Sequence, residues 1–286
     1  MLLPGIVLII IFSYIPMAGN ILAFQRFIPA KGLFGDQQWV GLYQFEYLFK
    51  LPGFRDALRN TVYISFMKIV AGIVTPVFFA ILINELRVRF LKRAVQTIVY
   101  LPHFLSWVIL AGVFIDILSP SYGLVNRLLQ SMGIEPIFFL GDNRWFPYVL
   151  VATDTWKEFG FGTIVFLAAI TSVNPNLYEA AVMDGANKLR QIWHITLPGM
   201  TPIILLVSLL SIGNILNANF DQVFNLYSPQ VYESGDVLDT LVYRIGLVDA
   251  NYSLSTAIGL FKSLVACFLI STFYYLAYKI SDYRIF

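Results

Sequence analysis

The sequence predicts an all-α membrane protein with about six transmembrane helices. Hydrophobic residues make up 58% of its 286 positions and charged residues only 13%, whereas soluble domains average near a quarter charged. A helix that crosses the hydrocarbon core needs roughly 20 apolar residues. Six stretches of a single transmembrane domain qualify: 2–24, 61–84, 94–118, 146–173, 199–220 and 254–280.

The first stretch, 2–24, contains no charged residue. It lacks a basic leading region and is longer than the core of a typical signal peptide, so it predicts a retained span. Aromatic and aliphatic residues then recur at helical spacing. They predict a short helix in the membrane interface, with Trp39, Tyr43 and Tyr47 at the level of the lipid headgroups.

The second and third stretches are nearly free of charge. The second, 61–84, carries only Lys68, and the third, 94–118, carries His103 and Asp116. Pro102 interrupts the third stretch, and proline inside a helix removes a backbone hydrogen bond. We therefore expect one kinked span there.

The fourth stretch, 146–173, is the most polar. Asp154, Lys157 and Glu158 stand within five residues, and the uncharged remainder, 159–173, is too short to cross a membrane alone. Ionisable groups at membrane depth are costly and usually face a bundle interior or a wet cavity. One side of this helix is therefore expected to line a polar path.

The fifth stretch, 199–220, carries no charge, and the sixth, 254–280, carries Lys262 and Lys279. An even number of spans puts both termini on one side of the membrane. Loops 85–93 and 174–198 with the C-terminal tail hold eight basic residues in about 42 positions, beside four acids. The opposite loops spread eight basic residues over about 96 positions with ten acids. The denser set predicts a cytoplasmic location for both termini.

The loop 174–198 carries strong local signals. Asn174 is a good N-cap for a helix whose first turn holds Pro175, where a missing N–H costs nothing. Gly185 tolerates the left-handed conformation that ends many helices. A second short helix is expected from Lys188 to Thr196, before the next span begins at Pro198. The pattern predicts a helix–turn–helix on the cytoplasmic face.

The loop contains Glu179-Ala180-Ala181, then Gly185 after three residues, and Ile195-Thr196-Leu197-Pro198 after nine more. This spacing resembles the coupling motif of the membrane subunits of binding-protein-dependent ABC importers. The small side chains of two alanines keep the first helix slim enough to enter a groove on another protein. Asp184 joins the coupling candidates Glu179, Ala180, Ala181, Gly185, Ile195, Leu197 and Pro198.

Further segments resemble the carbohydrate-uptake branch of that family, and the opening LLPG with YIPM resembles permeases for complex oligosaccharides. These segments include WVGLYQFEYLF after the first span, Asn60-Thr61, and the run 220–224 after the fifth. The resemblance implies a type I importer permease fold, with the loop 174–198 as coupling helix.

It also implies several partners, namely a second and unlike permease subunit, two ATP-binding subunits, an extracytoplasmic solute-binding protein and the lipid of a bacterial cytoplasmic membrane. The chain has no Gly-rich phosphate loop followed by Lys-Ser/Thr, so ATP and Mg²⁺ are expected on the partner ATPases and no cofactor on this chain. In the family's scheme, closure of the ATPases moves the coupling helices. Glu179 would then bond to the ATPase.

Polar residues in the fourth and fifth spans are candidates for the solute path, because amides, carboxylates and aromatic rings suit sugars. On the fourth span we expect the candidates to share one side of the helix. They are Asp154, Lys157, Glu158, Phe161, Asn214, Asn217, Asn219 and Asp221. The alternative is structural: Lys157 pairs with Asp154 or Glu158, and the asparagines bond to neighbouring helices.

Three lysines in or near the membrane, at positions 68, 157 and 262, would suit an acidic glycan such as an alginate or pectin fragment. Lys68 and Lys262 have a second interpretation, as internal ion pairs or as side chains that snorkel to the interface.

Other function classes fit less well. An ABC permease for a non-sugar solute is one alternative, and a secondary transporter that uses the charges of the fourth span is another. The net charge of +2 is too small and scattered for a nucleic-acid surface. Cys267 stands alone, so an internal disulfide is excluded. Neither a Ser/His/Asp set nor an HExxH motif occurs, and the two histidines lack a second ligand at metal spacing, which argues against an enzyme.

Overall fold

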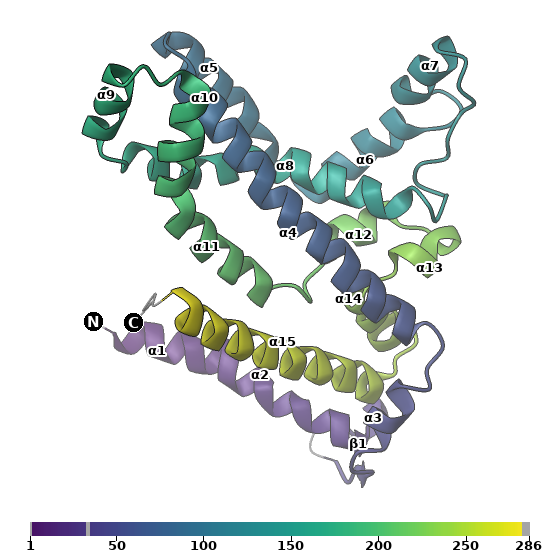
Figure 1. The fold of residues 1–286 in the computed structure, drawn as a ribbon. Helices are drawn as coiled ribbons and strands as arrows, with labels where there is room; N and C mark the ends of the chain where they lie inside the picture. The colour runs from purple at the N-terminus through teal and green to yellow at the C-terminus, as the bar shows by residue number, and fades with distance from the viewer. Residues whose placement is uncertain (1, 33–34, 282–286) are drawn as a thin grey trace.

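The computed structural model describes residues 2–32 and 35–281, and these residues are almost entirely helical (Figure 1). Four helical segments are long and apolar enough to cross a membrane by themselves: Leu3–Phe24, Phe54–Glu85, Lys188–Gly213 and Tyr252–Tyr275. Two bent helix pairs bring the number to six if each pair is one span. The predicted membrane fold with about six spans is confirmed.

The first span is a continuous rod of mixed helix types. It consists of α1 (Leu3–Ile9), a π turn (Ile10–Tyr14), α2 (Ile15–Met17) and a 3₁₀ segment (Ala18–Phe24). A small antiparallel hairpin of β1 (Gln25–Arg26) and β2 (Gln38–Trp39) follows, with a 3₁₀ turn at Pro29–Lys31 inside it and then the short helix α3 (Tyr43–Leu48).

Two long helices, α4 (Phe54–Glu85) and α8 (Phe146–Thr171), cross at the centre of the molecule (Figure 1). Helix α4 begins at Phe54, before the apolar stretch that starts at Thr61, and buries Phe54, Ala57 and Asn60. Charged residues lower the hydropathy of this first part, so hydropathy alone does not assign it to the helix. The Asn60 amide donates to the carbonyl oxygens of Glu233 and Asp236 at 2.9 and 3.2 Å, so this extension anchors a distant loop.

The third span differs from the expected single kinked helix. Helix α5 (Arg89–Tyr100) and a 3₁₀ turn (Leu101–Phe104) lead into α6 (Trp107–Leu118) at a bend of 103°. Pro102 lies inside the 3₁₀ turn, and the Ser106 hydroxyl accepts from the backbone N–H of Ile109 at 3.4 Å to cap a new helix. The proline and the new cap together turn a kink into a break.

The fifth span also corrects the expectation. Helix α10 (Lys188–Gln191), a π turn (Ile192–Thr196) and α11 (Leu197–Gly213) form one continuous helix, so the expected boundary at Pro198 is wrong. The helix ends at Gly213 instead of Phe220. The segment 214–219 is irregular because asparagine amides compete for the helical hydrogen bonds, and Asn219 adopts a positive φ of 67°.

The remaining helices complete the fold. They are α7 (Leu124–Ser131), α9 (Pro175–Met183), α12 (Phe220–Leu226), a 3₁₀ turn (Pro229–Val231), α13 (Tyr232–Gly235), α14 (Leu238–Tyr243), a π turn (Arg244–Val248) and α15 (Tyr252–Ser281). Helix α15 packs along the first span (Figure 1). Arg284 of the basic tail lies outside the described residues.

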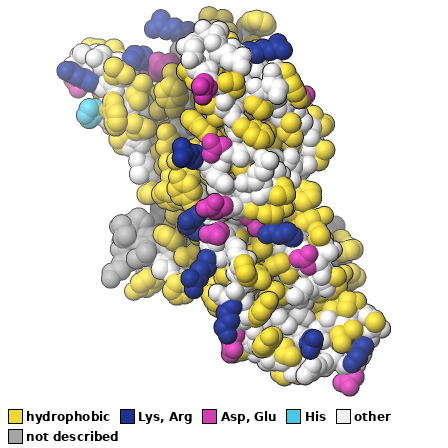
Figure 2. Space-filling model, turned by 90° about the vertical axis from the view of Figure 1, so that its right-hand side faces the viewer, with side chains coloured by type: hydrophobic (Ala, Val, Ile, Leu, Met, Phe, Trp, Pro, Cys, Tyr) yellow, Lys and Arg dark blue, Asp and Glu magenta, His cyan; other side chains and the backbone are white. Residues whose placement is uncertain are grey.

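Apolar side chains cover large areas of the outer surface. Figure 2 shows one such face, on which hydrophobic side chains are interrupted by Lys, Arg, Asp and Glu. In the first span, Leu3 and Phe12 are each 73% exposed. A chain with this surface requires lipid or protein around it.

Candidate functional site

The loop 174–198 folds at one end of the molecule, with α9 bent by 68° from α8 (Figure 1). The Asn174 side chain accepts from the N–H of Asn176 at 3.0 Å, as an N-cap does. Gly185 has φ +72°, and the N–H groups of Gly185 and Ala186 donate to the carbonyls of Val182 and Ala181. These two bonds form a Schellman cap, and the predicted start and stop of this helix are confirmed.

The outer face of α9 is exposed. Glu179, Ala180 and Asp184 are exposed, and Ala181 is half-buried. Large apolar side chains accompany them, with Met183 87% and Val182 60% exposed. Exposed apolar side chains beside an acid suit contact with another protein.

The inner side of the loop is tied to the transmembrane helices. The Tyr178 and Thr196 hydroxyls are 3.0 Å apart, and Lys188 pairs with Glu85 at the end of α4 at 3.2 Å. Ile195, Leu197 and Pro198 all lie in the continuous helix that becomes α11. The Tyr178–Thr196 contact therefore links α9 to the helix that continues as α11.

The second candidate site is a cleft of about 290 Å³ between α4, α8 and the end of α11. Five of the candidate path residues line it: Asp154, Glu158, Asn214, Asn217 and Asn219. An adjoining cavity of about 460 Å³ is lined by the same three asparagines with Phe220 and Asp221. The irregular segment 214–219 thus belongs to both cavities.

Lys157 and Phe161 do not line the cleft, although both are tied to Glu158 on the same side of α8, Lys157 directly and Phe161 through His103. Asp154 and Glu158 form one row of the helix, four residues apart, and line the cleft. Lys157 is 7% exposed and donates to the His103 carbonyl at 2.8 Å and to Glu158 at 2.9 Å. The Phe161 ring stacks on His103 with centroids 4.1 Å apart.

Residues that the sequence argument left outside the path complete the cleft. Lys68 pairs with Asp154 at 3.6 Å, donates to the Ala218 carbonyl at 2.8 Å, and also contacts the Gln222 side chain. Asp154 accepts from Asn219 at 3.2 Å. The buried Ser65 hydroxyl lines the cleft and has no hydrogen-bond partner within the described ranges. Lys68 was visible as a charge inside an apolar stretch, whereas nothing in the sequence indicated its partner.

The profile of the family described as "Binding-protein-dependent transport system inner membrane component" matches residues 69–285. The chain belongs to this family. It is therefore a multi-pass inner-membrane component of an ABC transport system that depends on a binding protein, and the prediction of a transport subunit rather than an enzyme is confirmed.

Similar proteins carry the same architecture. The polygalacturonan/rhamnogalacturonan transport system permease protein YteP of Bacillus subtilis (strain 168) is 40% identical, over 99% of this chain and 88% of its own. A chain in the crystal structure of a bacterial ABC transporter involved in the import of the acidic polysaccharide alginate is 40% identical. It superposes with a TM-score of 0.90 over 98% of this chain and 94% of its own.

A second structure, of a bacterial alginate ABC transporter in complex with alginate pentasaccharide-bound periplasmic protein, contains a chain 39% identical to this one. Its TM-score is 0.90, over 100% of this chain and 95% of that chain. Together with the family match, these structures confirm the type I importer permease fold expected from the coupling motif.

Proposed function

We propose that this permease translocates an acidic oligosaccharide, built of uronate residues, across the cytoplasmic membrane. The observation that carries the proposal is the cleft between α4, α8 and the end of α11, whose lining of amides, carboxylates and one lysine suits a hydroxylated, charged chain. The similarity to permeases for rhamnogalacturonan and alginate supports the acidic class.

The lysines give this proposal less support than their number suggests. Lys68 is paired with Asp154, Lys157 with Glu158, and Lys262 with Asp239 at 2.5 Å. For a uronate to be recognised in the cleft, Lys68 must therefore break its ion pair with Asp154 and pair with the carboxylate of the solute. The ordered amides of the segment 214–219 would hold the neutral hydroxyl groups.

The test uses the assembled importer in vesicles, with its partner subunits and binding protein, and measures ATP-driven uptake of a labelled uronate oligosaccharide. Asn217 is exposed in both cavities, so Asn217→Ala is expected to reduce uptake several-fold with assembly unchanged. Asn225→Ala, on α12 and outside both cavities, is the matched control. Equal uptake by the wild type and the Asn217 variant would contradict the proposed path, and uptake of only neutral sugars would contradict the acidic class.

The coupling role of α9 is a second part of the proposal. The chain would pair with an unlike permease over two cytoplasmic ATPases that hold ATP and Mg²⁺, with the exposed Glu179, Ala180 and Asp184 in an ATPase groove. The support is the slim exposed face of α9 and the rigid helix that follows it. Closure of the ATPases would then move α11 and the amides at its end.

Gly185→Trp tests this coupling. The variant places a bulky side chain at a positive φ next to the exposed face, where a Cβ meets open space, so the complex is expected to assemble. ATP hydrolysis should continue while uptake falls at least tenfold. Normal uptake by the Gly185→Trp variant would contradict the coupling role. If Asn217→Ala lowers uptake but Gly185→Trp does not, the solute path is supported and the coupling role is refuted.

A further inference from the structure

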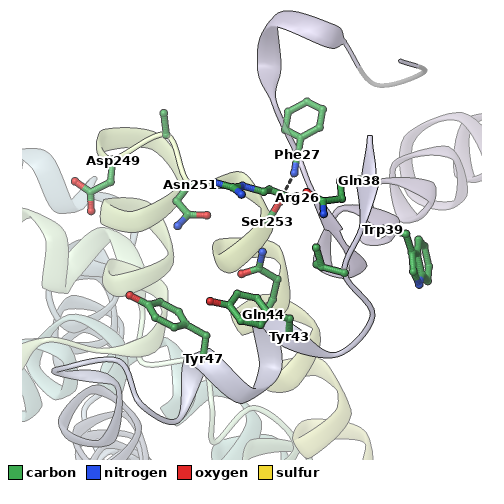
Figure 3. A pocket seen from close by; sticks show the side chains of 12 residues that line it. Arg26, Phe27, Gln38, Trp39, Tyr43, Gln44, Tyr47, Asp249, Asn251 and Ser253 are labelled. Atoms are coloured by element: carbon green, nitrogen blue, oxygen red, sulfur yellow. Dashed lines mark hydrogen bonds between the residues drawn. The ribbon is translucent and has the colours of Figure 1, made fainter. Parts of the chain in front are cut away.

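A polar cavity of about 780 Å³ lies between the β1–β2 hairpin, helix α3 and the start of α15 (Figure 3). It is at the end of the molecule away from loop 174–198 (Figure 1). None of its lining residues belongs to the cleft or cavity described above. The solute path and the coupling loop therefore leave this cavity unexplained.

A buried amide faces this cavity. Gln44, on α3, is only 8% exposed, and its side chain makes no hydrogen bond to any residue that the structure describes. Its amide is therefore available to bond to a ligand in the cavity. Beside it, the Ser253 hydroxyl is 4% exposed and accepts from the Phe27 N–H at 2.9 Å. The floor of the cavity thus presents polar groups to a ligand.

The cavity also carries two opposite charges that do not pair with each other. Arg26 extends from β1 toward the middle of the cavity, and Asp249 lies at its far side (Figure 3). Among the described residues, neither forms an ion pair. Ala250, between Asp249 and Asn251, has φ +53°, which costs about 1–2 kcal/mol for an alanine. A ligand with one negative and one positive group matches this arrangement.

Lipid-facing surface adjoins the cavity. Trp39 is 61% exposed and stacks on Phe24, the last residue of the first span, with ring centroids 5.8 Å apart. Along that span Ile21 and Met17 are 49% and 59% exposed, and only 6% of its apolar window is buried. Aromatic residues at a span end typically lie at the headgroup level. Acyl chains beside Ile21 and Met17 would place a headgroup at the cavity.

We propose that this cavity binds the phosphoethanolamine headgroup of a membrane phospholipid. The Arg26 guanidinium pairs with the phosphate, and the Asp249 carboxylate pairs with the ammonium group. The amides of Gln44 and Asn251 bond to the remaining oxygens. A saccharide would use the amides, but the separate opposite charges and the adjoining apolar span favour the phospholipid.

Native mass spectrometry of the purified importer tests this proposal. The complex is mixed with phosphatidylethanolamine or phosphatidylglycerol of the same acyl chains, and retained lipid is counted. The wild type is expected to retain phosphatidylethanolamine preferentially. Arg26→Gln should lower the retention of phosphatidylethanolamine about tenfold, because one charge-assisted hydrogen bond to the phosphate is lost. Asp249→Asn should remove the preference over phosphatidylglycerol, which lacks the ammonium group.

Lys31→Gln is the matched control, because Lys31 is an exposed cation of the same hairpin that lies outside the cavity and donates to the Asp36 carbonyl. It should leave lipid retention unchanged. Equal retention of the two lipids by the wild type overturns the proposal, as does unchanged retention by Arg26→Gln. Binding of a trigalacturonate that is lost in Arg26→Gln, with lipid retention unaffected, overturns it in favour of a sugar site.

Discussion

At the scale of single residues, two lysines in the long helices of this permease pair with acids on other helices. Lys68 of α4 meets Asp154 of α8, and Lys262 of α15 meets Asp239 of α14. A lone charge in an apolar bundle is costly, and removing one partner of a buried pair leaves the other uncompensated. These pairs therefore constrain how the helices assemble.

The Lys68–Asp154 pair gives a stability prediction. The Lys68 side chain is 9% exposed, so Asp154→Leu is expected to lower the free energy of unfolding by about 3 kcal/mol. Adding Lys68→Met in the same chain removes the stranded charge and should recover most of that loss. Denaturation of the purified permease in mixed micelles measures both. A double variant as unstable as Asp154→Leu would show that the pair is not what stabilises this contact.

At the scale of elements, α8 packs closely against α5, just before the break in the third span. A Cβ on Gly160 of α8 would lie 1.8 Å from the carbonyl oxygen of Val99 in α5. The helix backbones therefore touch, as in other glycine-mediated membrane packing. Near this contact, His103 lies next to Glu158 and Phe161.

Gly160→Ala is expected to push α5 from α8 and lower assembly severely, because backbone atoms cannot yield as a flexible side chain can. Gly162→Ala is the matched control. Its Cβ would meet only the Pro76 side chain at 3.1 Å, so its effect should be mild. Yield and thermal stability of the purified importer measure both variants, and equal tolerance of the two would refute the close contact.

At the scale of the whole molecule, the loop 174–198 and the hairpin with α3 lie at opposite ends (Figure 1). The density of basic residues in the loops predicts a cytoplasmic location for the first of these. The proposed coupling to cytoplasmic ATPases requires this orientation.

Single-cysteine labelling checks the orientation. In a Cys267→Ser background, Lys31→Cys should react with a membrane-impermeant maleimide on intact spheroplasts, and Arg190→Cys should react only after the membrane is opened. Both positions are exposed in the structure. The reverse pattern would contradict the proposed topology.

The sequence by itself determined that the chain lies in a membrane, how many spans it has, and the local structure of the loop 174–198. Hydropathy depends on composition along the chain, and the cap at Asn174 and the turn at Gly185 depend only on neighbouring residues. The same local signals, with the family resemblance they carried, were sufficient to identify an ABC importer permease.

Only the tertiary structure decided which polar residues meet. It put Asp154 and Glu158 in the lining of the cleft, whereas Lys157 and Phe161 contact His103. It also paired Lys68 with Asp154, across 86 positions of sequence, and ended the fifth span at Gly213. Such outcomes depend on how the helices pack and on which carbonyls and charges of one helix face those of another. Helical periodicity within one segment contains no information about these contacts between segments.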